Sequence, residues 1–251
     1  MMRLVSVDHD YGRGPVLQAV SLGVAPGRVT VLCGPNAVGK TTLLRIMAGV
    51  LAPTRGTLFL GAHSYDDLGA RGRARSLAFM SQRFECSSGF SVRRILELAR
   101  VMIGRNSKAI ESVVEALDLE ALLPRTLATL STGQAQRVAC ARALIQAPLD
   151  GVVLLDEPLA SLDPAWSERV SALLARRARE GTTVVVSVHE LPVAARLAED
   201  AMLLSSRSGL MHGSAQVVLA PEALEAAFGV PFEMVRTADG AEVPLPMSAR
   251  S

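Results

Sequence analysis

Lysine is almost absent from this sequence of 251 residues. Of its 26 basic residues, only Lys40 and Lys108 are lysine, and all the others are arginine. Because arginine is used almost everywhere else, a position that still carries lysine can be one where the function needs an ammonium group. Lys108 stands in the polar run RNSK, which is typical of a solvated surface, whereas Lys40 stands between a glycine and two threonines. We therefore expect a function for Lys40.

Long apolar runs, an excess of charge and an even set of cysteines are absent too. Hydrophobic residues make up 49% of the chain, but no apolar run reaches the roughly 18 residues of a membrane-spanning helix. The N-terminus lacks the apolar region of a secretory signal. A net charge of +2 gives no indication of nucleic-acid binding. The three widely spaced cysteines, Cys33, Cys86 and Cys140, favour free thiols in a reducing compartment over disulfides or a zinc site.

Short apolar segments alternate with helical patterns along most of the chain, which favours a parallel α/β sheet. We expect strands at 2–7, 16–23, 28–33, 57–60, 77–80, 152–156, 184–188 and 201–205, and helices at 40–50, 164–179 and 191–198. A more charged stretch at about 91–146 has helical periodicity and interrupts the alternation, so it is expected to be a helical insertion. The segment from 238 is small and polar with two prolines, and we expect it to be loosely ordered.

Residues 34–42, GPNAVGKTT, match the phosphate-loop pattern G-x-x-x-x-G-K-[ST] between an expected strand and an expected helix. Gly34 and Gly39 let consecutive N–H groups face phosphate oxygens, and the helix N-terminus adds its positive dipole end. Lys40 supplies a compact charge for the β- and γ-phosphates, and Thr41 offers a hydroxyl to Mg²⁺. The expected nucleotide contacts of this loop are Gly34, Pro35, Asn36, Ala37, Val38, Gly39, Lys40, Thr41 and Thr42. GTPases, small-molecule kinases and ATPases all carry such a loop, so other motifs must decide the class.

Polar side chains follow two of the expected buried strands. Asp156 and Glu157 come after VVLL at 152–155, and His189 comes after VVVSV at 184–188. In open α/β sheets ligands bind at the carboxyl edge of the strands. Asp156 is expected to hold Mg²⁺ through water, and Glu157 to orient or deprotonate an attacking water. A neutral His189 could reach the γ-phosphate or hold the water and Glu157, although a lone histidine is more often a helix cap or a surface group.

The stretch 130–137, LSTGQAQR, has the pattern of a helix start. Ser131 and Gln134 fit a capping box, in which each side chain bonds the other residue's backbone N–H. The free N–H groups and the dipole of the same helix end also suit an anion. Helix capping and phosphate recognition would therefore both depend on the same free N–H groups at this helix N-terminus.

Several motifs then occur in one order along the chain. They are Tyr11, the phosphate loop, Gln82, LSTGQAQR, Asp156 with Glu157, SLD at 161–163, and His189. This combination resembles the ATP-binding cassette (ABC) ATPases over nearly the whole chain. It is very specific, because it joins the phosphate loop to an LSGGQ-like motif.

The resemblance implies a role for each matching position. Tyr11 resembles the aromatic residue on which adenine stacks; by itself it would be a turn residue. Gln82 resembles the glutamine that touches Mg²⁺ and the water and links the core to the helical insertion; by itself it would be a loop amide. Asp163 resembles the residue that communicates across a dimer; by itself it would be a helix cap before Pro164.

In this family two such domains pack head to tail. Each ATP lies between the phosphate loop of one domain and the LSGGQ-like helix end of the other. The resemblance therefore implies contacts with the partner's nucleotide from Ser131, Thr132, Gly133 and Gln134.

Two positions depart from the usual family pattern. Ala37 stands where many relatives have glycine, and it would cost about 1 kcal/mol if that position needs a positive φ. We expect it to be tolerated. Thr132 stands where the signature usually has glycine. Its side chain could add a hydroxyl donor or crowd the closed dimer, and the sequence leaves both open.

The resemblance also implies the fold class: α/β, a P-loop NTPase core with a mixed sheet, an N-terminal antiparallel β subdomain and an inserted α-helical subdomain. A single ABC ATPase domain is expected at 1–237. Residues 1–82 and 147–237 would form the core with the β subdomain. Residues 83–146 would form the helical subdomain, and 238–251 a loose tail.

The implied function is ATP hydrolysis, with Mg²⁺, driving a separate transmembrane permease at the cytoplasmic face of the inner membrane. A second ATPase subunit, giving a homodimer, and indirectly a substrate-binding protein are the further expected partners; no nucleic acid is expected. GPNAVGKTTLLRIMAGVLAPTRG and the late LEAAFGVPFEM are similar to ATPases of importers for iron–siderophore complexes, haem and cobalamin.

Three other functions remain open beside this one. The first is another importer ATPase or a soluble ABC ATPase, for example one in iron–sulfur cluster assembly. The second is a nucleotide-gated binding module without turnover, which Glu157 disfavours. The third is a P-loop kinase, which gives no reason for LSTGQ.

Overall fold

The computed structural model describes residues 1–82, 89–101 and 107–247, and of 107–109 the backbone only. Its central sheet has six strands in the order β10-β9-β3-β8-β7-β6. These are β10 Gly209–Ser214, β9 Asp200–Ser205, β3 Val29–Cys33, β8 Thr183–Ser187, β7 Val152–Leu155 and β6 Leu77–Met80. All neighbours pair in parallel except β10 with β9. Every residue of β3, β7 and β8 is buried, as expected for apolar strands covered on both faces.

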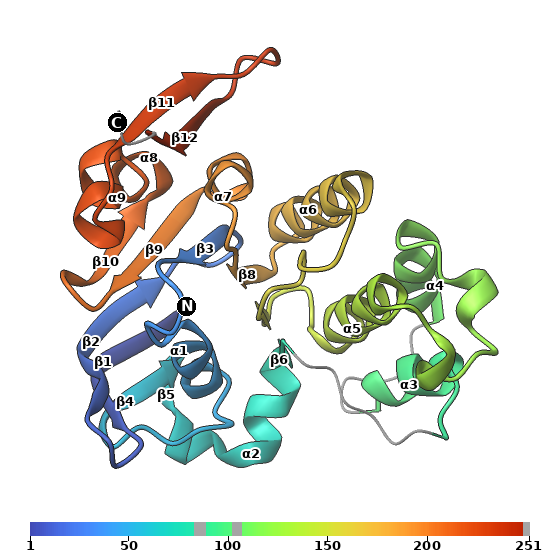
Figure 1. Ribbon diagram of the computed structural model, residues 1–251. Coiled ribbons are helices and arrows are strands. Elements are labelled where there is room, and N and C mark those ends of the chain that lie inside the picture. Colours follow the sequence, from blue (N-terminus) through green and yellow to red (C-terminus); the bar gives the residue numbers. More distant parts are fainter. Residues whose placement is uncertain (83–88, 102–106, 248–251) are drawn as a thin grey trace.

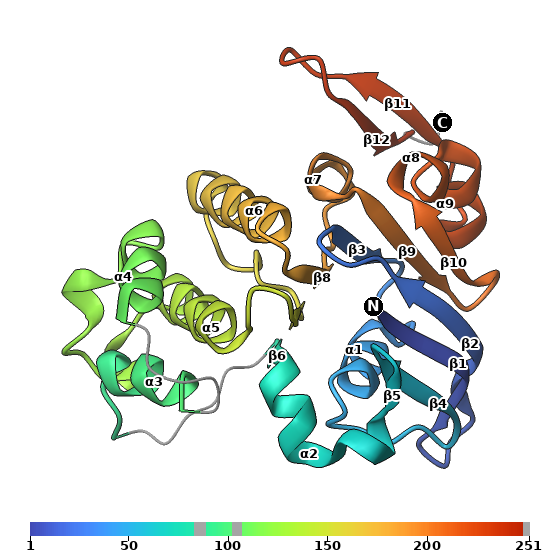
Figure 2. The same ribbon diagram turned by 180° about the vertical axis from the view of Figure 1, so that it is seen from behind.

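A second sheet lies at the N-terminal side, as Figures 1 and 2 show from opposite directions. Its order is β2-β1-β4-β5, and all its pairs are antiparallel. The strands are β1 Met2–Asp10, β2 Pro15–Val24, β4 Arg55–Leu60 and β5 His63–Ser64. Helix α1, Lys40–Met47, shares a hydrophobic core with residues of both sheets, so this subdomain is fixed to the central sheet.

The helical lobe stands apart from the N-terminal sheet in both ribbon views (Figures 1 and 2). It contains α3 Val92–Ala99, α4 Ser107–Ala116, the short helices η1 Glu120–Leu122 and η2 Leu127–Thr129, and α5 Thr132–Gln146. Helix α5 contacts α3 and α4 on one side and β6 and β7 on the other. It therefore connects the lobe to the central sheet.

The remaining helices lie along the sheet and toward the C-terminus. They are α2 Tyr65–Ser76, α6 Pro164–Arg179, α7 Leu191–Leu197, α8 Ala215–Val218 and α9 Pro221–Phe228. Helices α6 and α7 pack near β3 and β8. The mixed sheet, the antiparallel N-terminal sheet and the group of helices confirm the predicted fold class. None of the helices in the described ranges is long and apolar enough to cross a membrane.

The segment from 238 differs from the loose tail expected for it. Strand β12, Glu242–Pro246, pairs antiparallel with β11, Phe232–Arg236, and packs against α7. Val243 is 3% exposed, so this strand contributes an apolar side chain to the interior. Asp239 in the connecting turn binds the Arg196 guanidinium at 2.9 and 3.3 Å. The prolines are tolerated because a hairpin edge strand leaves N–H positions that need no partner. Residues 248–251 lie outside the described part of the chain.

Candidate nucleotide-binding and hydrolysis site

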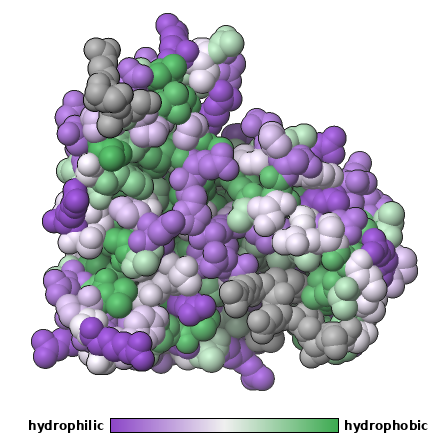
Figure 3. All heavy atoms as spheres, viewed as in Figure 1, coloured by the Kyte–Doolittle hydropathy of each residue, from purple (hydrophilic) through white to green (hydrophobic). Residues whose placement is uncertain are grey.

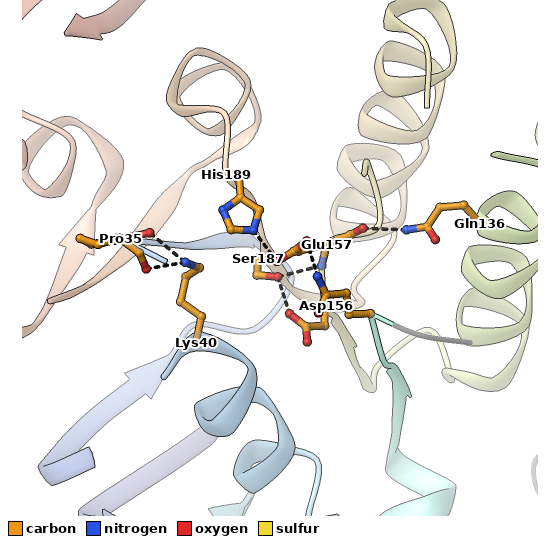
Figure 4. A network of polar contacts seen from close by, with 9 residues as sticks. Pro35, Lys40, Gln136, Asp156, Glu157, Ser187 and His189 are labelled. Carbon is orange, nitrogen blue, oxygen red and sulfur yellow. Dashed lines mark hydrogen bonds and ion pairs between the residues drawn. The ribbon is translucent and has the colours of Figure 1, made fainter. Parts of the chain in front are cut away.

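The expected polar residues gather at the carboxyl edge of the central sheet. The phosphate loop follows β3, Asp156 and Glu157 follow β7, His189 follows β8, and Gln82 follows β6. Because these four strands are parallel, their carboxyl ends share one edge. Figure 4 shows Lys40, Asp156, Glu157 and His189 near one another there, with His189 pointing toward Glu157 and Lys40 toward the carbonyl oxygen of Pro35.

The phosphate loop is closed around the Lys40 ammonium group. Lys40 Nζ donates to the carbonyl oxygens of Gly34 and Pro35, at 2.8 Å each. Burial lowers the pKa of Lys40, and the charge of nearby Glu157 opposes that shift. Gly34 has φ +139°, and a Cβ there would lie 2.0 Å from the Leu204 carbonyl oxygen, so only glycine fits. The loop thus holds a buried positive charge at the N-terminus of α1, where a phosphate is favoured.

Asp156 is the most buried acid of the site, at 1% exposure. Its Oδ1 accepts a hydrogen bond from Ser187 Oγ at 2.8 Å, and Ser187 Oγ accepts the Glu157 N–H at 2.8 Å. Asp156 Oδ2 is buried, and none of the residues that the structure describes donates a hydrogen bond to it. A buried carboxylate oxygen left without a donor is costly, so this atom fits a position that faces a metal-bound water.

Glu157 is held by side chains from three other segments. Its Oε2 accepts from Gln82 Nε2 at 2.8 Å, and its Oε1 makes a short contact with His189 Nε2. Its backbone carbonyl accepts from Gln136 Nε2 at 2.6 Å. Its φ of +53° is a conformation that costs about 1 kcal/mol or more for a non-glycine residue. These contacts fix the carboxylate at the cavity in spite of the backbone strain.

A cavity of about 530 Å³ is lined by Tyr11 and by most of the expected phosphate-loop contacts, but not by Gly34, Pro35 and Val38. Its walls are formed by Tyr11, Val16, Asn36, Ala37, Gly39, Lys40, Thr41, Thr42, Gln82, Glu157 and His189. Tyr11 is 53% exposed, and its hydroxyl lies 3.3 Å from Thr42 Oγ1. The Tyr11 ring stands edge-on to the buried His9 ring, with 4.5 Å between centroids. An exposed aromatic face therefore lies at the rim of the phosphate loop.

The LSTGQ residues and Asp163 do not line this cavity. Ser131 caps α5, and Ser131 and Gln134 make both bonds of a capping box, which confirms the predicted cap. Thr132 is exposed at the first helical position. Asp163 caps α6 by accepting from the Trp166 N–H at 2.9 Å, which confirms the cap expected before Pro164.

Two residues that contact the acids were missed by sequence reasoning. Ser187 is the last residue of β8, and a hydroxyl directly after three consecutive valines was the available signal. Gln136 lies within LSTGQAQR, yet its contact with the Glu157 carbonyl depends on how α5 packs beside β7. The sequence left open whether position 37 needs a positive φ. Ala37 has a φ of +61°, which is the conformation that favours glycine.

The fold and the phosphate loop define a nucleotide-binding α/β protein of the P-loop class, and comparison with known proteins identifies the family. The ABC transporter family model matches residues 17–160. The chain belongs to the ABC transporter family and is an ATPase. It is 35% identical to the hemin import ATP-binding protein HmuV of Nocardia farcinica, with 96% of this chain and 86% of that protein covered. It is 31% identical to HmuV of Rhodopseudomonas palustris strain BisB5, with 95% and 94% covered.

Solved structures agree with the fold. An ABC transporter assigned to the metal-chelate type, in an inward-facing conformation, matches with a TM-score of 0.80 and 24% identity, covering 98% of this chain and 97% of that chain. A dimeric bacterial ABC transporter cassette matches with a TM-score of 0.77 and 26% identity, covering 86% and 99%. Another structure of that cassette, bound to ADP and Pi, has a TM-score of 0.75 and 27% identity, covering 86% and 99%.

Proposed function

We propose that this chain is the ATP-hydrolysing subunit of an importer for haem or a related iron chelate, and that it drives a separate transmembrane permease. The observation that carries the cargo class is the similarity to hemin import ATP-binding proteins along nearly the whole chain, at 31–35% identity. Cargo selection itself would lie mainly in the permease and in a substrate-binding protein. The ATPase would then lie at the cytoplasmic face of the inner membrane.

Hydrolysis in this proposal uses the groups around the cavity. Lys40 and the loop N–H groups bind the β- and γ-phosphates, and Tyr11 stacks on the adenine. Glu157 accepts a proton from the attacking water as the water's oxygen bonds to the γ-phosphorus and the bond to ADP breaks. The contacts of Gln82 and His189 with the two Glu157 oxygens keep that carboxylate oriented toward the cavity.

Mg²⁺ fits the donors that the site presents. Asp156 Oδ2 is a buried oxygen without a partner among the described residues, and Thr41 and Gln82 line the cavity that also holds Lys40. We assign Asp156, Thr41 and Gln82 to the ion, with waters and phosphate oxygens as its further ligands. The ion would neutralise charge on the phosphates.

The signature residues complete the site only in a pair of chains. Ser131, Thr132, Gly133, Gln134 and Asp163 lie outside the cavity that holds Lys40, and the related cassette is dimeric in its solved structure. We therefore propose a homodimer in which the N-terminus of α5 in one copy faces the γ-phosphate held by the other copy's Lys40.

The helical lobe offers apolar surface for a permease. Phe90, Leu98 and Val101 are exposed by 42%, 40% and 69%, and hydrophobic residues are visible over this lobe at the right of Figure 3. Leu98 lies on α3, and Phe90 and Val101 lie just before and just after this helix. Exposed apolar residues that lie close together on a surface are typical of interaction sites. Through Gln82, which contacts Glu157, this lobe would sense the state of the nucleotide.

The test is purification of the tagged chain from native membranes, identification of the co-purifying permease, and transport in proteoliposomes. We expect ATP-dependent uptake of haem, and a loss of phosphate release of at least about 100-fold in Glu157→Gln. Uptake of a ferric siderophore or of cobalamin, without uptake of haem, would show that the proposed cargo is wrong. A chain that never associates with a membrane protein would favour a soluble ABC ATPase. Unchanged turnover in Glu157→Gln would refute the catalytic assignment.

A further inference from the structure

Arg137 is a buried charged residue that the hydrolysis mechanism does not use. It lies on α5, five residues after Thr132, and is only 8% exposed. Its Nη1 donates to the carbonyl oxygens of Leu117 and Asp118, at 2.7 and 3.2 Å. These carbonyls directly follow the C-terminus of α4, where a cation compensates the negative end of the helix dipole. Arg137 thus joins α5 to the end of α4.

The same guanidinium group also contacts α6. Arg137 Cζ lies 3.8 Å from the centroid of the Trp166 ring, which is within cation–π range. Trp166 is the only tryptophan of the chain. A second cation, Arg169, lies 4.9 Å from the same centroid, but it is exposed on α6 itself. Of these two cations, Arg137 is therefore the one that bridges different helices.

Trp166 stands in the first turn of α6, whose N-cap is Asp163. The preceding loop approaches the start of α5 closely: a Cβ at Gly133 would be 3.1 Å from the Ser161 carbonyl oxygen. The N-termini of α5 and α6 are thus held together at two places, by this close approach and by the Arg137–Trp166 contact.

We propose that Arg137 and Trp166 are positioning residues, which hold the Ser131–Gln134 segment and Asp163 in one fixed arrangement for the partner copy's nucleotide. This inference rests on the proposed dimeric function and adds a role for two residues that contact no nucleotide in it. Because the pair joins α4, α5 and α6, its loss leaves the Lys40 cavity intact but lets the two helix N-termini move independently.

The first test is ATP-driven dimerisation in a Glu157→Gln background, where hydrolysis does not reopen the dimer. Arg137→Met keeps the apolar stem of the side chain and removes the guanidinium group with its charge. We expect it to raise the dimer dissociation constant about 3- to 30-fold, as loss of a desolvated cation–π contact predicts. ATP affinity of the monomer should stay within about twofold, since Arg137 does not line the cavity. Arg169→Met is the matched control, and it should leave dimerisation unchanged.

A second measurement does not depend on dimerisation. Spin labels at Thr132→Cys and Ala165→Cys in the monomer, in a Cys86→Ser background, report the distance between the two helix N-termini. The buried Cys33 and Cys140 are not accessible to the label. With Arg137 present we expect one narrow distance distribution. Arg137→Met should broaden it, and Arg169→Met should not.

The outcomes separate the two proposals. If the parent fails to dimerise with ATP, the proposed dimeric function fails, and the distance measurement still decides the positioning role. If Arg137→Met lowers thermal stability but changes neither dimerisation nor the distance distribution, the pair is a stabilising contact only and the inference is overturned. Should Arg137→Met not fold, Trp166→Phe provides the same comparison with a smaller ring. An unchanged distance distribution and unchanged dimerisation in Trp166→Phe would also count against the inference.

Discussion

Ser187 Oγ donates a hydrogen bond of 2.8 Å to Asp156 Oδ1, between the ends of two neighbouring parallel strands. Asp156 is 1% exposed and its other oxygen has no partner. This hydroxyl is therefore the one side-chain donor that the described residues provide to the buried carboxylate.

Ser187→Ala should lower the free energy of unfolding by about 1–3 kcal/mol, because it leaves a buried carboxylate without a donor. Urea unfolding measures the change. The matched control is Thr30→Val on the adjacent strand β3, where the buried hydroxyl has no partner to lose. We expect Thr30→Val to be neutral or stabilising. Equal losses in the two variants would show that the Ser187 bond contributes nothing specific.

Ala37→Gly should raise the free energy of unfolding by about 0.5–1 kcal/mol. Ala37 has φ +61°, where an L-residue pays a steric cost that glycine avoids, and part of the gain is offset by the greater freedom of glycine in the unfolded chain. Ala172→Gly is the control: Ala172 is exposed in the middle of α6, so glycine there should cost about 0.5–1 kcal/mol. A destabilising Ala37→Gly would mean that the loop does not have this conformation in solution.

ATP binding should take up protons at alkaline pH. Burial lowers the pKa of Lys40 below its usual 10.5 in the free protein, and phosphate charges beside the ammonium group raise it again. In the window between the lowered pKa and 10.5, the unfolded chain binds more protons than the folded one. Over this pH window, the contribution of Lys40 to the free energy of unfolding of the free protein therefore rises with pH. Bound ATP stabilises the protonated form of Lys40, so the folded protein takes up a proton when ATP binds.

Calorimetry at a pH just below 10.5, in buffers of different ionisation enthalpy, measures the proton uptake. Lys40→Arg is the control, because a guanidinium stays protonated at this pH and cannot take up a proton. The same uptake in Lys40→Arg would assign the protons to another group.

The placement of the acids, the histidine and the phosphate loop at one edge followed from the sequence, because each comes directly after an apolar strand and parallel strands share their carboxyl edge. The capping box of Ser131 and Gln134 was equally readable, since it depends on two residues three apart. Patterns of this kind can be predicted because their geometry depends only on residues close together in the sequence.

Contacts made by packing were not readable in the same way. The bonds from Ser187 and Gln136 to the acidic segment depend on strand order and on the position of α5. Helix α2 was missed because it is rich in arginine and kinked at Gly69, where φ is +58°, although its Ser64–Asp67 capping box was a usable signal. Strand β12 was missed because prolines at 244 and 246 are typical of loops.

Thr132 gives the sharpest test of the proposed dimer. It is exposed at the first position of α5 and does not line the Lys40 cavity. Thr132→Gly should therefore leave the ATP affinity of the monomer within about twofold and change only ATP-driven dimerisation or turnover. A change in monomer affinity would mean that the N-terminus of α5 reaches the chain's own nucleotide.

Three substitutions at this position separate the two effects that Thr132 could have. If its hydroxyl donates to the partner's γ-phosphate, Thr132→Ser keeps dimerisation, while Thr132→Val and Thr132→Gly weaken it, by about 10- to 150-fold for one hydrogen bond to a charged group. If its methyl group crowds the closed dimer, Thr132→Ser and Thr132→Gly dimerise more tightly, and the nearly isosteric Thr132→Val behaves like the parent. Equal dimerisation in all three would show that the side chain at 132 does not face the partner's nucleotide.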